Sequence, residues 1–205
     1  MKILAVGMNY PEHNKEQKNS LLLQEPVIFS KPESALLREG KPFFIPDFAN
    51  QFEYETEIVV RINRLGKSIS QRYAHRYYDE ITVGIDFTAR DLQRDLRSKG
   101  LPWDLCKGFD GSAAVGKWIP VSKLTSTVDN LHFHLDIDGK TVQQGWTGDM
   151  MHSIDKIISF VSTYFTLKTG DIIFTGTPAG VGPISENQHL EAYLEDIKVL
   201  EFNIK

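Results

Sequence analysis

The chain has 205 residues, of which 41% are hydrophobic and 24% charged, a composition that excludes disordered and fibrous proteins. Its formal net charge of −4 argues against a nucleic-acid partner, because such proteins need a basic surface to displace counterions. The length suits a single domain over residues 1–205 that can bury a substantial core.

Two features predict a cytoplasmic protein without a membrane partner. Cys106 is the sole cysteine, so no disulfide can form within the chain, as is usual in a reducing compartment. The apolar run at residues 2–7 is short and lacks a small-residue cleavage site, which is typical of a first strand and not of a signal peptide. No apolar stretch approaches the roughly 20 residues that span a bilayer.

Strand patterns are spread along the whole chain, whereas helical patterns are few. Asp138-Gly139 lies between two alternating runs and predicts a two-residue type I′ hairpin turn. Because the strands do not alternate regularly with helices, we expect an α+β fold with a large mixed sheet. The predicted strands cover residues 2–7, 27–30, 54–62, 80–87, 131–137, 141–144, 171–175 and 190–204.

The clearest helix is predicted at residues 153–165, where Ser153 is a suitable N-cap. Its apolar face, which should pack on the sheet, consists of Ile154, Ile157, Ile158, Val161 and Phe165.

A shorter helix is predicted near the N-terminus, because Pro11 suits a first helical turn. His13 and Glu16 would then be neighbours at positions i and i+3. A carboxylate beside an imidazole orients it and raises its basicity, so this pair could be a general base. An ordinary exposed His/Glu pair is the alternative.

Two carboxylates, Glu55 and Glu57, stand two residues apart in a strand pattern that continues into a β-branched apolar run. Side chains at i and i+2 of a strand share one face, roughly 7 Å apart, so both can converge on one point. Acids that enter a core need partners, either distant basic residues or a metal ion. Asp86, at the end of a later strand pattern, could complete a triad for Mg²⁺, Mn²⁺ or Ca²⁺. Taken alone, Glu-x-Glu also fits a solvated strand face.

Two later segments carry further candidates. Lys107 follows an apolar loop at residues 100–106 and could hold a substrate carboxylate, although a solvated lysine is the alternative. Residues 174–183 offer hydroxyls and backbone N–H groups in a glycine-rich turn that could cradle an anion. This turn lacks the Lys-Ser/Thr of a phosphate-binding loop, and a purely structural turn is the alternative.

Taken together and in this order, five segments resemble the fumarylacetoacetate hydrolase family, in particular its short single-domain members that are similar to acylpyruvase and oxaloacetate decarboxylase. Each segment alone is weak evidence, but five in sequence are specific. The similar stretches are Gly7-x-Asn9-Tyr10 with His13 and Glu16, Glu55-x-Glu57, residues 86–91 with Gln93, residues 99–103 with Lys107, and residues 170–182.

The resemblance implies a mixed β-roll or barrel-like sheet with short helices, assembled as a homodimer. It implies that Mg²⁺ or Mn²⁺, with Ca²⁺ as a substitute, is held by Glu55, Glu57 and Asp86. The resemblance also implies a catalytic His13–Glu16 dyad on a lid helix. The remaining implied site residues are Lys107 beside the metal, with Arg90, Gln93 and Thr177 seating the substrate.

The expected activity is that of a metal-dependent hydrolase or lyase. A small 2-oxo or 2,4-dioxo acid would be cleaved at a carbon–carbon bond, by hydrolysis or decarboxylation, through a metal-bound enolate. The alternative reaction is isomerisation or tautomerisation of a 2-hydroxy-dienoate or of oxaloacetate, in which the dyad only moves protons. Two non-enzymatic alternatives are a divalent-cation-dependent metabolite-binding module and an acidic strand that forms part of a subunit interface.

The sequence departs from the family pattern at Met8, where many relatives have Arg or Lys. Without that cation, the outer carboxylate of a substrate would be held differently, or Arg90 or Lys107 would hold it instead. Substrate choice is also expected to depend on the loop near residues 17–25.

Overall fold

The computed structural model describes residues 1–17, 24–37 and 41–205. Most of the loop near residues 17–25, from which we expected substrate choice, lies outside the described residues.

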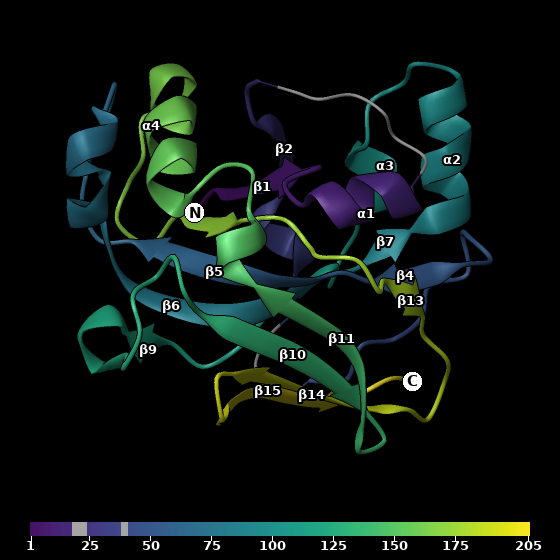
Figure 1. The fold of residues 1–205 in the computed structure, drawn as a ribbon. Coiled ribbons are helices and arrows are strands. Elements are labelled where there is room, and N and C mark those ends of the chain that lie inside the picture. Colours follow the sequence, from purple (N-terminus) through teal and green to yellow (C-terminus); the bar gives the residue numbers. More distant parts are fainter. Residues whose placement is uncertain (18–23, 38–40) are drawn as a thin grey trace.

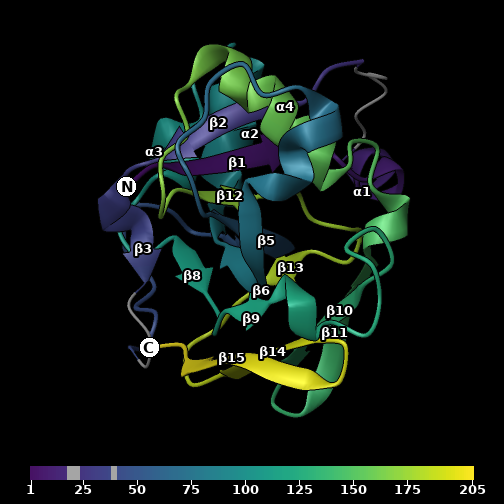
Figure 2. The same ribbon diagram turned by 90° about the vertical axis from the view of Figure 1, so that its left-hand side faces the viewer.

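The largest sheet is mixed and curls into a half-barrel (Figures 1 and 2). Its strand order is β2-β1-β12-β5-β6-β8-β3, and β9 also pairs with β6. Two pairings, β1 with β12 and β3 with β8, are parallel, and the others are antiparallel. The strands are β1 Ile3–Gly7, β2 Val27–Lys31, β3 Leu36–Leu37, β5 Thr56–Ile62, β6 Tyr78–Asp86, β8 Ala113–Val115, β9 Ile119–Pro120 and β12 Ile172–Phe174.

A second sheet has the order β11-β10-β14-β15, all antiparallel. Its first hairpin confirms the predicted turn, because Asp138 and Gly139 have φ of 52° and 76°, as type I′ requires. The single strand predicted at residues 190–204 is wrong: the chain turns at Glu195, with φ of 50°, and forms two strands. The strands are β10 His132–Ile137, β11 Lys140–Trp146, β14 His189–Leu194 and β15 Ile197–Asn203.

A small third sheet, β13-β4-β7, lies beside the end of β5. It consists of β4 Phe52–Tyr54, β7 Thr88–Ala89 and β13 Gly182–Pro183. The strand predicted at residues 54–62 is therefore broken at Glu55, which separates β4 from β5.

The helices are short and lie above the large sheet in Figure 1, with α4 apart from a group formed by α1, α2 and α3. None of the helices within the described ranges is long and apolar enough to cross a bilayer. The α-helices are α1 Pro11–Glu16, α2 Arg90–Ser98, α3 Asp104–Lys107 and α4 Ile154–Tyr164, and the 3₁₀ helices are η1 Glu33–Ala35, η2 Gln71–Arg76, η3 Val121–Lys123 and η4 Thr147–Asp149.

Helix α4 begins as predicted, because the Ser153 side chain accepts a hydrogen bond from the backbone N–H of Lys156. Its apolar face ends one turn earlier than we expected. Phe165 is the C-cap in an extended conformation, so its side chain leaves the helical stripe and stays 40% exposed.

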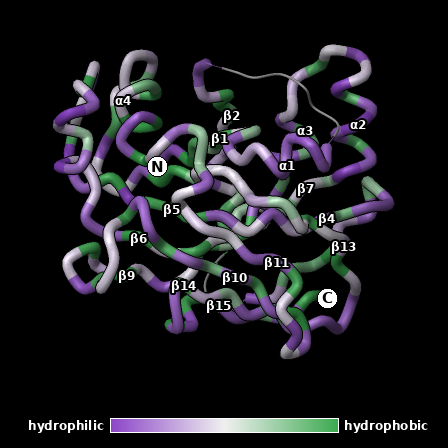
Figure 3. Tube along the Cα trace, in the orientation of Figure 1, coloured by the Kyte–Doolittle hydropathy of each residue, from purple (hydrophilic) through white to green (hydrophobic). Residues whose placement is uncertain are grey.

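Both faces of the large sheet are buried at its inner strands, which explains the continuous apolar runs of β1 and β12. In β1, Leu4 and Val6 join the larger core cluster, whereas Ile3 and Ala5 join a smaller cluster on the opposite face. Helix α2, in contrast, is largely hydrophilic in Figure 3. The core therefore holds the ends of β5 and β6 rigidly, while α2 supplies polar groups above them.

Candidate active site and metal centre

The three carboxylates predicted as metal ligands lie together at the ends of β5 and β6. Glu55, Glu57 and Asp86 are buried, and one carboxylate oxygen of each lies within 4.8 Å of the others. The two strands are antiparallel neighbours, with Glu57 opposite Gly84, and the backbone N–H of Asp86 donates to the Glu55 carbonyl at 2.8 Å. Glu55 occupies the break between β4 and β5, so a strand end and a backbone hydrogen bond position the cluster.

Basic residues distant in sequence compensate two of these acids. Glu55 accepts hydrogen bonds from Lys107 Nζ and Arg90 Nη2, each at 2.6 Å. Lys107 Nζ also donates to Asp86 Oδ2 at 2.8 Å, and Lys31 Nζ lies 2.5 Å from Asp86 Oδ1. We expected Lys107 to emerge from a loop, but it is the last residue of helix α3.

Glu57 is the least compensated member of the cluster. Its Oε2 accepts from the backbone N–H of Gly176 at 2.7 Å. Burial raises the pKa of Glu57 well above its ordinary value, and the negative charges of Asp86 and Glu55 raise it further. Burial also tends to raise the pKa of Glu55, but Lys107 and Arg90 outweigh it and hold this pKa below its usual range. Glu57 is therefore the acid of the cluster whose negative charge is least compensated, and a bound cation would favour its ionised form.

The donor set of this cluster fits a hard divalent cation. Asp86 Oδ1 is buried and makes no hydrogen bond within the described residues, although the ammonium of Lys31 lies 2.5 Å from it. A buried carboxylate oxygen without a hydrogen-bond donor can accept a cation as a ligand. Three oxygen-donating carboxylates suit Mg²⁺, Mn²⁺ or Ca²⁺ better than zinc.

The predicted dyad lies over the same cluster. His13 Nδ1 is 3.1 Å from Glu16 Oε2 on α1, and the His13 side chain is only 10% exposed. A cavity of about 40 Å³ lies between His13 of α1 and the carboxylates Glu55 and Glu57. Every predicted site residue except Glu16 and Asp86 borders it: His13, Glu55, Glu57, Arg90, Gln93, Lys107 and Thr177.

The glycine-rich turn at residues 174–183 holds anions, and these are the protein's own carboxylates. The backbone N–H of Gly176 binds Glu57, and that of Gly180 donates to Glu16 Oε1 at 3.3 Å. Gly176 has φ of 98°, and a Cβ there would lie 2.8 Å from the Asn9 Cβ. Only glycine fits, so this turn joins a carboxylate of the buried cluster to helix α1.

Three residues of the site have no recognisable signal in the sequence. Lys31 contacts Asp86, and Glu53 accepts from Arg90 Nε at 2.6 Å. Gln143, on β11 of the second sheet, bonds Thr177, Pro178 and the N–H of Thr56. The one available hint is that Gln143 occupies an inward position of its strand, where a polar residue is unusual.

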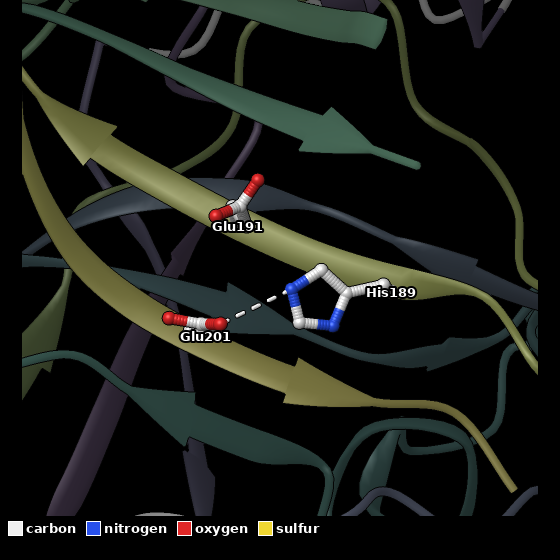
Figure 4. A group of neighbouring side chains, drawn as sticks. All are labelled: His189, Glu191 and Glu201. Atoms are coloured by element: carbon white, nitrogen blue, oxygen red, sulfur yellow. Dashed lines mark ion pairs between the residues drawn. The ribbon is translucent and has the colours of Figure 1, made fainter. Parts of the chain in front are cut away.

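A second acidic group, on β14 and β15, is already compensated (Figure 4). His189 Nε2 lies 3.2 Å from Glu201, and Lys198 Nζ lies 2.8 Å from Glu191 and 2.7 Å from Glu201. Because Lys198 already pairs with both carboxylates at this partly exposed position, we assign no cation to this group.

A curled mixed sheet with short helices and a buried three-carboxylate cluster under a small cavity defines an α+β protein with a candidate site for a divalent cation. The family model described as fumarylacetoacetate (FAA) hydrolase C-terminal matches residues 2–205, and the chain belongs to this family. The resemblance seen in the sequence and the expected fold class are thereby confirmed.

Relatives with related names are similar over nearly the whole chain. The mitochondrial oxaloacetate tautomerase FAHD1 of Mus musculus is 39% identical in an alignment that covers 99% of this chain and 91% of the relative. The oxaloacetate tautomerase YcgM of Escherichia coli (strain K12) is 36% identical over 92% of this chain and 86% of its own. Both are named as enzymes.

Solved structures share the fold. A putative fumarylacetoacetate hydrolase family protein from Yersinia pestis CO92 has a TM-score of 0.94 and 37% identity, over 100% of this chain and 93% of its own. The fumarylpyruvate hydrolase from Pseudomonas aeruginosa, in complex with Mn²⁺ and pyruvate, has a TM-score of 0.93 and 29% identity, over 100% of this chain and 89% of its own.

Proposed function

We propose that this protein is a tautomerase that interconverts the keto and enol forms of a small 2-oxo acid, with oxaloacetate as the first candidate. The observation that carries the proposal is the His13–Glu16 pair facing three buried carboxylates across a cavity of about 40 Å³. Two relatives named oxaloacetate tautomerase, at 39% and 36% identity, favour this alternative over carbon–carbon bond cleavage.

Glu55, Glu57 and Asp86 would hold Mg²⁺ or Mn²⁺, and Mn²⁺ is present in the fumarylpyruvate hydrolase of similar fold. When bound, the cation supplies Lewis acidity toward the 1-carboxylate and 2-oxo groups of a substrate, which makes the C3 protons more acidic.

His13 is proposed to move the proton. Glu16 accepts a hydrogen bond from Nδ1 in the tautomer that leaves Nε2 unprotonated, so Nε2 can take a proton from C3 and return it to oxygen or carbon. Glu16 is itself oriented by the Gly180 N–H, which keeps the imidazole over the cavity.

Lys107 is proposed to act as a fixed positive charge and not as a base. Burial tends to lower its pKa, but Asp86 and Glu55 outweigh this and raise the pKa above its ordinary value. Gln93 and Thr177 border the cavity and would seat the substrate, while Arg90, bonded to Glu53 and Glu55, would orient those acids.

Carbon–carbon hydrolysis is a second candidate, because the similar P. aeruginosa structure is a fumarylpyruvate hydrolase and a His/Glu pair can activate water. Hydrolysis needs an attacking water beside the substrate, whereas tautomerisation needs none.

The test follows enol loss from freshly dissolved oxaloacetate by ultraviolet absorbance with protein and Mg²⁺ or Mn²⁺, and measures pyruvate in parallel. We expect enol loss well above the spontaneous rate, without matching pyruvate, and its abolition by EDTA. Pyruvate formed in step with oxaloacetate loss would instead identify a decarboxylase, and cleavage of acetylpyruvate a hydrolase. Tight oxaloacetate binding without turnover would identify a metabolite-binding module.

We also propose that residues 1–205 act as one catalytic domain, in agreement with the match over residues 2–205. The homodimer stays a prediction, which light scattering of the purified protein would test.

A further inference from the structure

Helix α2 presents three polar side chains in a row along the cavity. Arg90, Gln93 and Arg97 are spaced i, i+3 and i+7, which places them on one face of the helix. All three border the cavity above the carboxylates. Arg90 and Gln93 are 2% and 6% exposed, whereas Arg97 is exposed, so the row runs from the floor of the cavity to its mouth.

The deeper cations of this cavity are fully engaged. Arg90 donates to Glu53, Glu55 and Gln93 at 2.5–2.6 Å. Lys107 Nζ donates to Glu55, Asp86 and Thr88 at 2.6–2.8 Å. Arg90 and Lys107 were the residues expected to hold the outer carboxylate in place of the cation that Met8 replaces. Both already form hydrogen bonds to the buried carboxylates.

Arg97 differs from them in having no ion pair or hydrogen bond from its side chain within the described part of the chain. It is therefore the cavity-lining cation whose charge no described carboxylate balances.

The charges of the site explain why such a cation is useful. Four buried carboxylates face three buried cations, so the formal charges of the ionised groups sum to one net negative charge; a bound divalent cation would make this sum one net positive charge. A monoanionic 2-oxo acid neutralises that charge, whereas a dianion leaves one negative charge at its far end. The carboxylates are Glu53, Glu55, Glu57 and Asp86, and the cations Lys31, Arg90 and Lys107.

We propose that Arg97 binds the second, outer carboxylate of a dicarboxylic 2-oxo acid and so makes the site select dianions over monoanions. This inference rests on the proposed function, because it assumes that the 1-carboxylate and 2-oxo groups lie against the buried carboxylate cluster. The outer end of a four-carbon diacid then points toward the mouth, where Arg97 lies and where Met8 also borders the cavity.

The test compares Arg97→Gln and Arg97→Lys with the wild type on oxaloacetate, a dianion, and 2-oxobutanoate, a monoanion of the same chain length. Deuterium uptake at C3, followed by NMR, reports proton transfer on both acids, and calorimetry in Mg²⁺ reports their binding. For Arg97→Gln we expect the KM and dissociation constant of oxaloacetate to rise about fivefold to tenfold. The kcat for oxaloacetate and all 2-oxobutanoate constants should stay within about twofold, and Arg97→Lys should restore most of the oxaloacetate affinity.

Arg94→Gln is the matched control. Arg94 lies on the same helix, is exposed and donates to Gln51 Oε1, but it does not border the cavity. Its loss should leave the preference for oxaloacetate unchanged. Added salt should weaken the preference of the wild type for oxaloacetate over 2-oxobutanoate, because the ion pair between Arg97 and the outer carboxylate lies at the exposed mouth of the cavity. Salt should not change this preference in Arg97→Gln.

The outcomes separate this inference from the proposed function. Equal effects of Arg97→Gln on both acids, or none on either, would overturn the role of Arg97 even in an active tautomerase. Absence of turnover together with a selective loss of oxaloacetate binding in Arg97→Gln would refute the tautomerase and leave the Arg97 subsite standing.

Discussion

Gln143 donates a hydrogen bond from Nε2 to the hydroxyl of Thr177 at 2.8 Å, across the boundary between the second sheet and the glycine-rich turn. The same amide donates to the Pro178 carbonyl at 2.9 Å and accepts from the Thr56 N–H at 3.0 Å. The Thr177 hydroxyl donates its hydrogen bond to the Thr56 carbonyl. The hydroxyl can therefore only accept a hydrogen bond from a group in the cavity, because its single proton is already used.

Replacing Gln143 by Leu should therefore destabilise the protein and misplace the turn that carries Gly176. The buried N–H of Thr56 would lose its partner, which costs about 1–3 kcal/mol. Urea unfolding measures this loss, and kcat should fall while KM changes less. Gln144→Leu, at the neighbouring exposed position, is the control and should change neither. Equal stability of the two variants would show that Gln143 does not brace the turn.

Glu57→Gln should abolish binding of Mg²⁺ and Mn²⁺, because it removes a candidate ligand and the negative charge that a bound cation would compensate. A bound cation stabilises the folded state, by about 2.7 kcal/mol at a concentration one hundred times its dissociation constant. The rise in Tm on adding Mn²⁺ should be present in the wild type and absent in Glu57→Gln.

Glu191→Gln tests the second acidic group in the same experiment. Lys198 already pairs with Glu191, so this variant should keep the full Mn²⁺ response. A lost response in Glu191→Gln and a retained one in Glu57→Gln would place the cation on the outer sheet and refute our assignment.

Glu16→Gln should lower kcat by about tenfold to a hundredfold without weakening the binding of Mn²⁺. The amide can no longer stabilise a protonated His13, so proton transfer slows, while the carboxylate cluster is untouched. Glu12→Gln, which removes an exposed partner of Lys15 on the same helix, is the control and should keep wild-type kcat. If both variants behave alike, α1 does not carry the general base.

The thermal stability of the wild type should fall as the pH drops through the ordinary histidine pKa of 6.5, in part because of His152. Burial lowers the pKa of this imidazole in the folded state, and Lys156 lowers it further. The unfolded chain thus binds the proton more strongly, so the stabilisation is complete above pH 6.5 and is lost toward the lower folded pKa. Melting curves between pH 5 and 8 should be flatter for His152→Asn; an unchanged slope would exclude this contribution.

Local patterns in the sequence were sufficient for the elements whose causes are local. Ser153 caps α4 through a residue three positions away, and Asp138-Gly139 closes its hairpin with its own two backbone conformations. The pairing of β5 with β6 follows from their apolar runs and brings Glu57 close to Asp86. The sequence therefore determined the strand-rich α+β fold and the identity of the three carboxylates.

Long-range packing in the fold selects the groups that neutralise these carboxylates and the groups that stay available. Lys31 reaches Asp86 across 55 positions of the chain, and Gln143 reaches Thr56 across 87. Such contacts produce no periodic pattern in the sequence, because they depend on how the large sheet curls and how the second sheet packs beside it. These ion pairs form between groups that the fold brings together and not between neighbours in sequence. Arg90 and Lys107 are therefore paired with buried acids, whereas Arg97 lies at the mouth of the cavity.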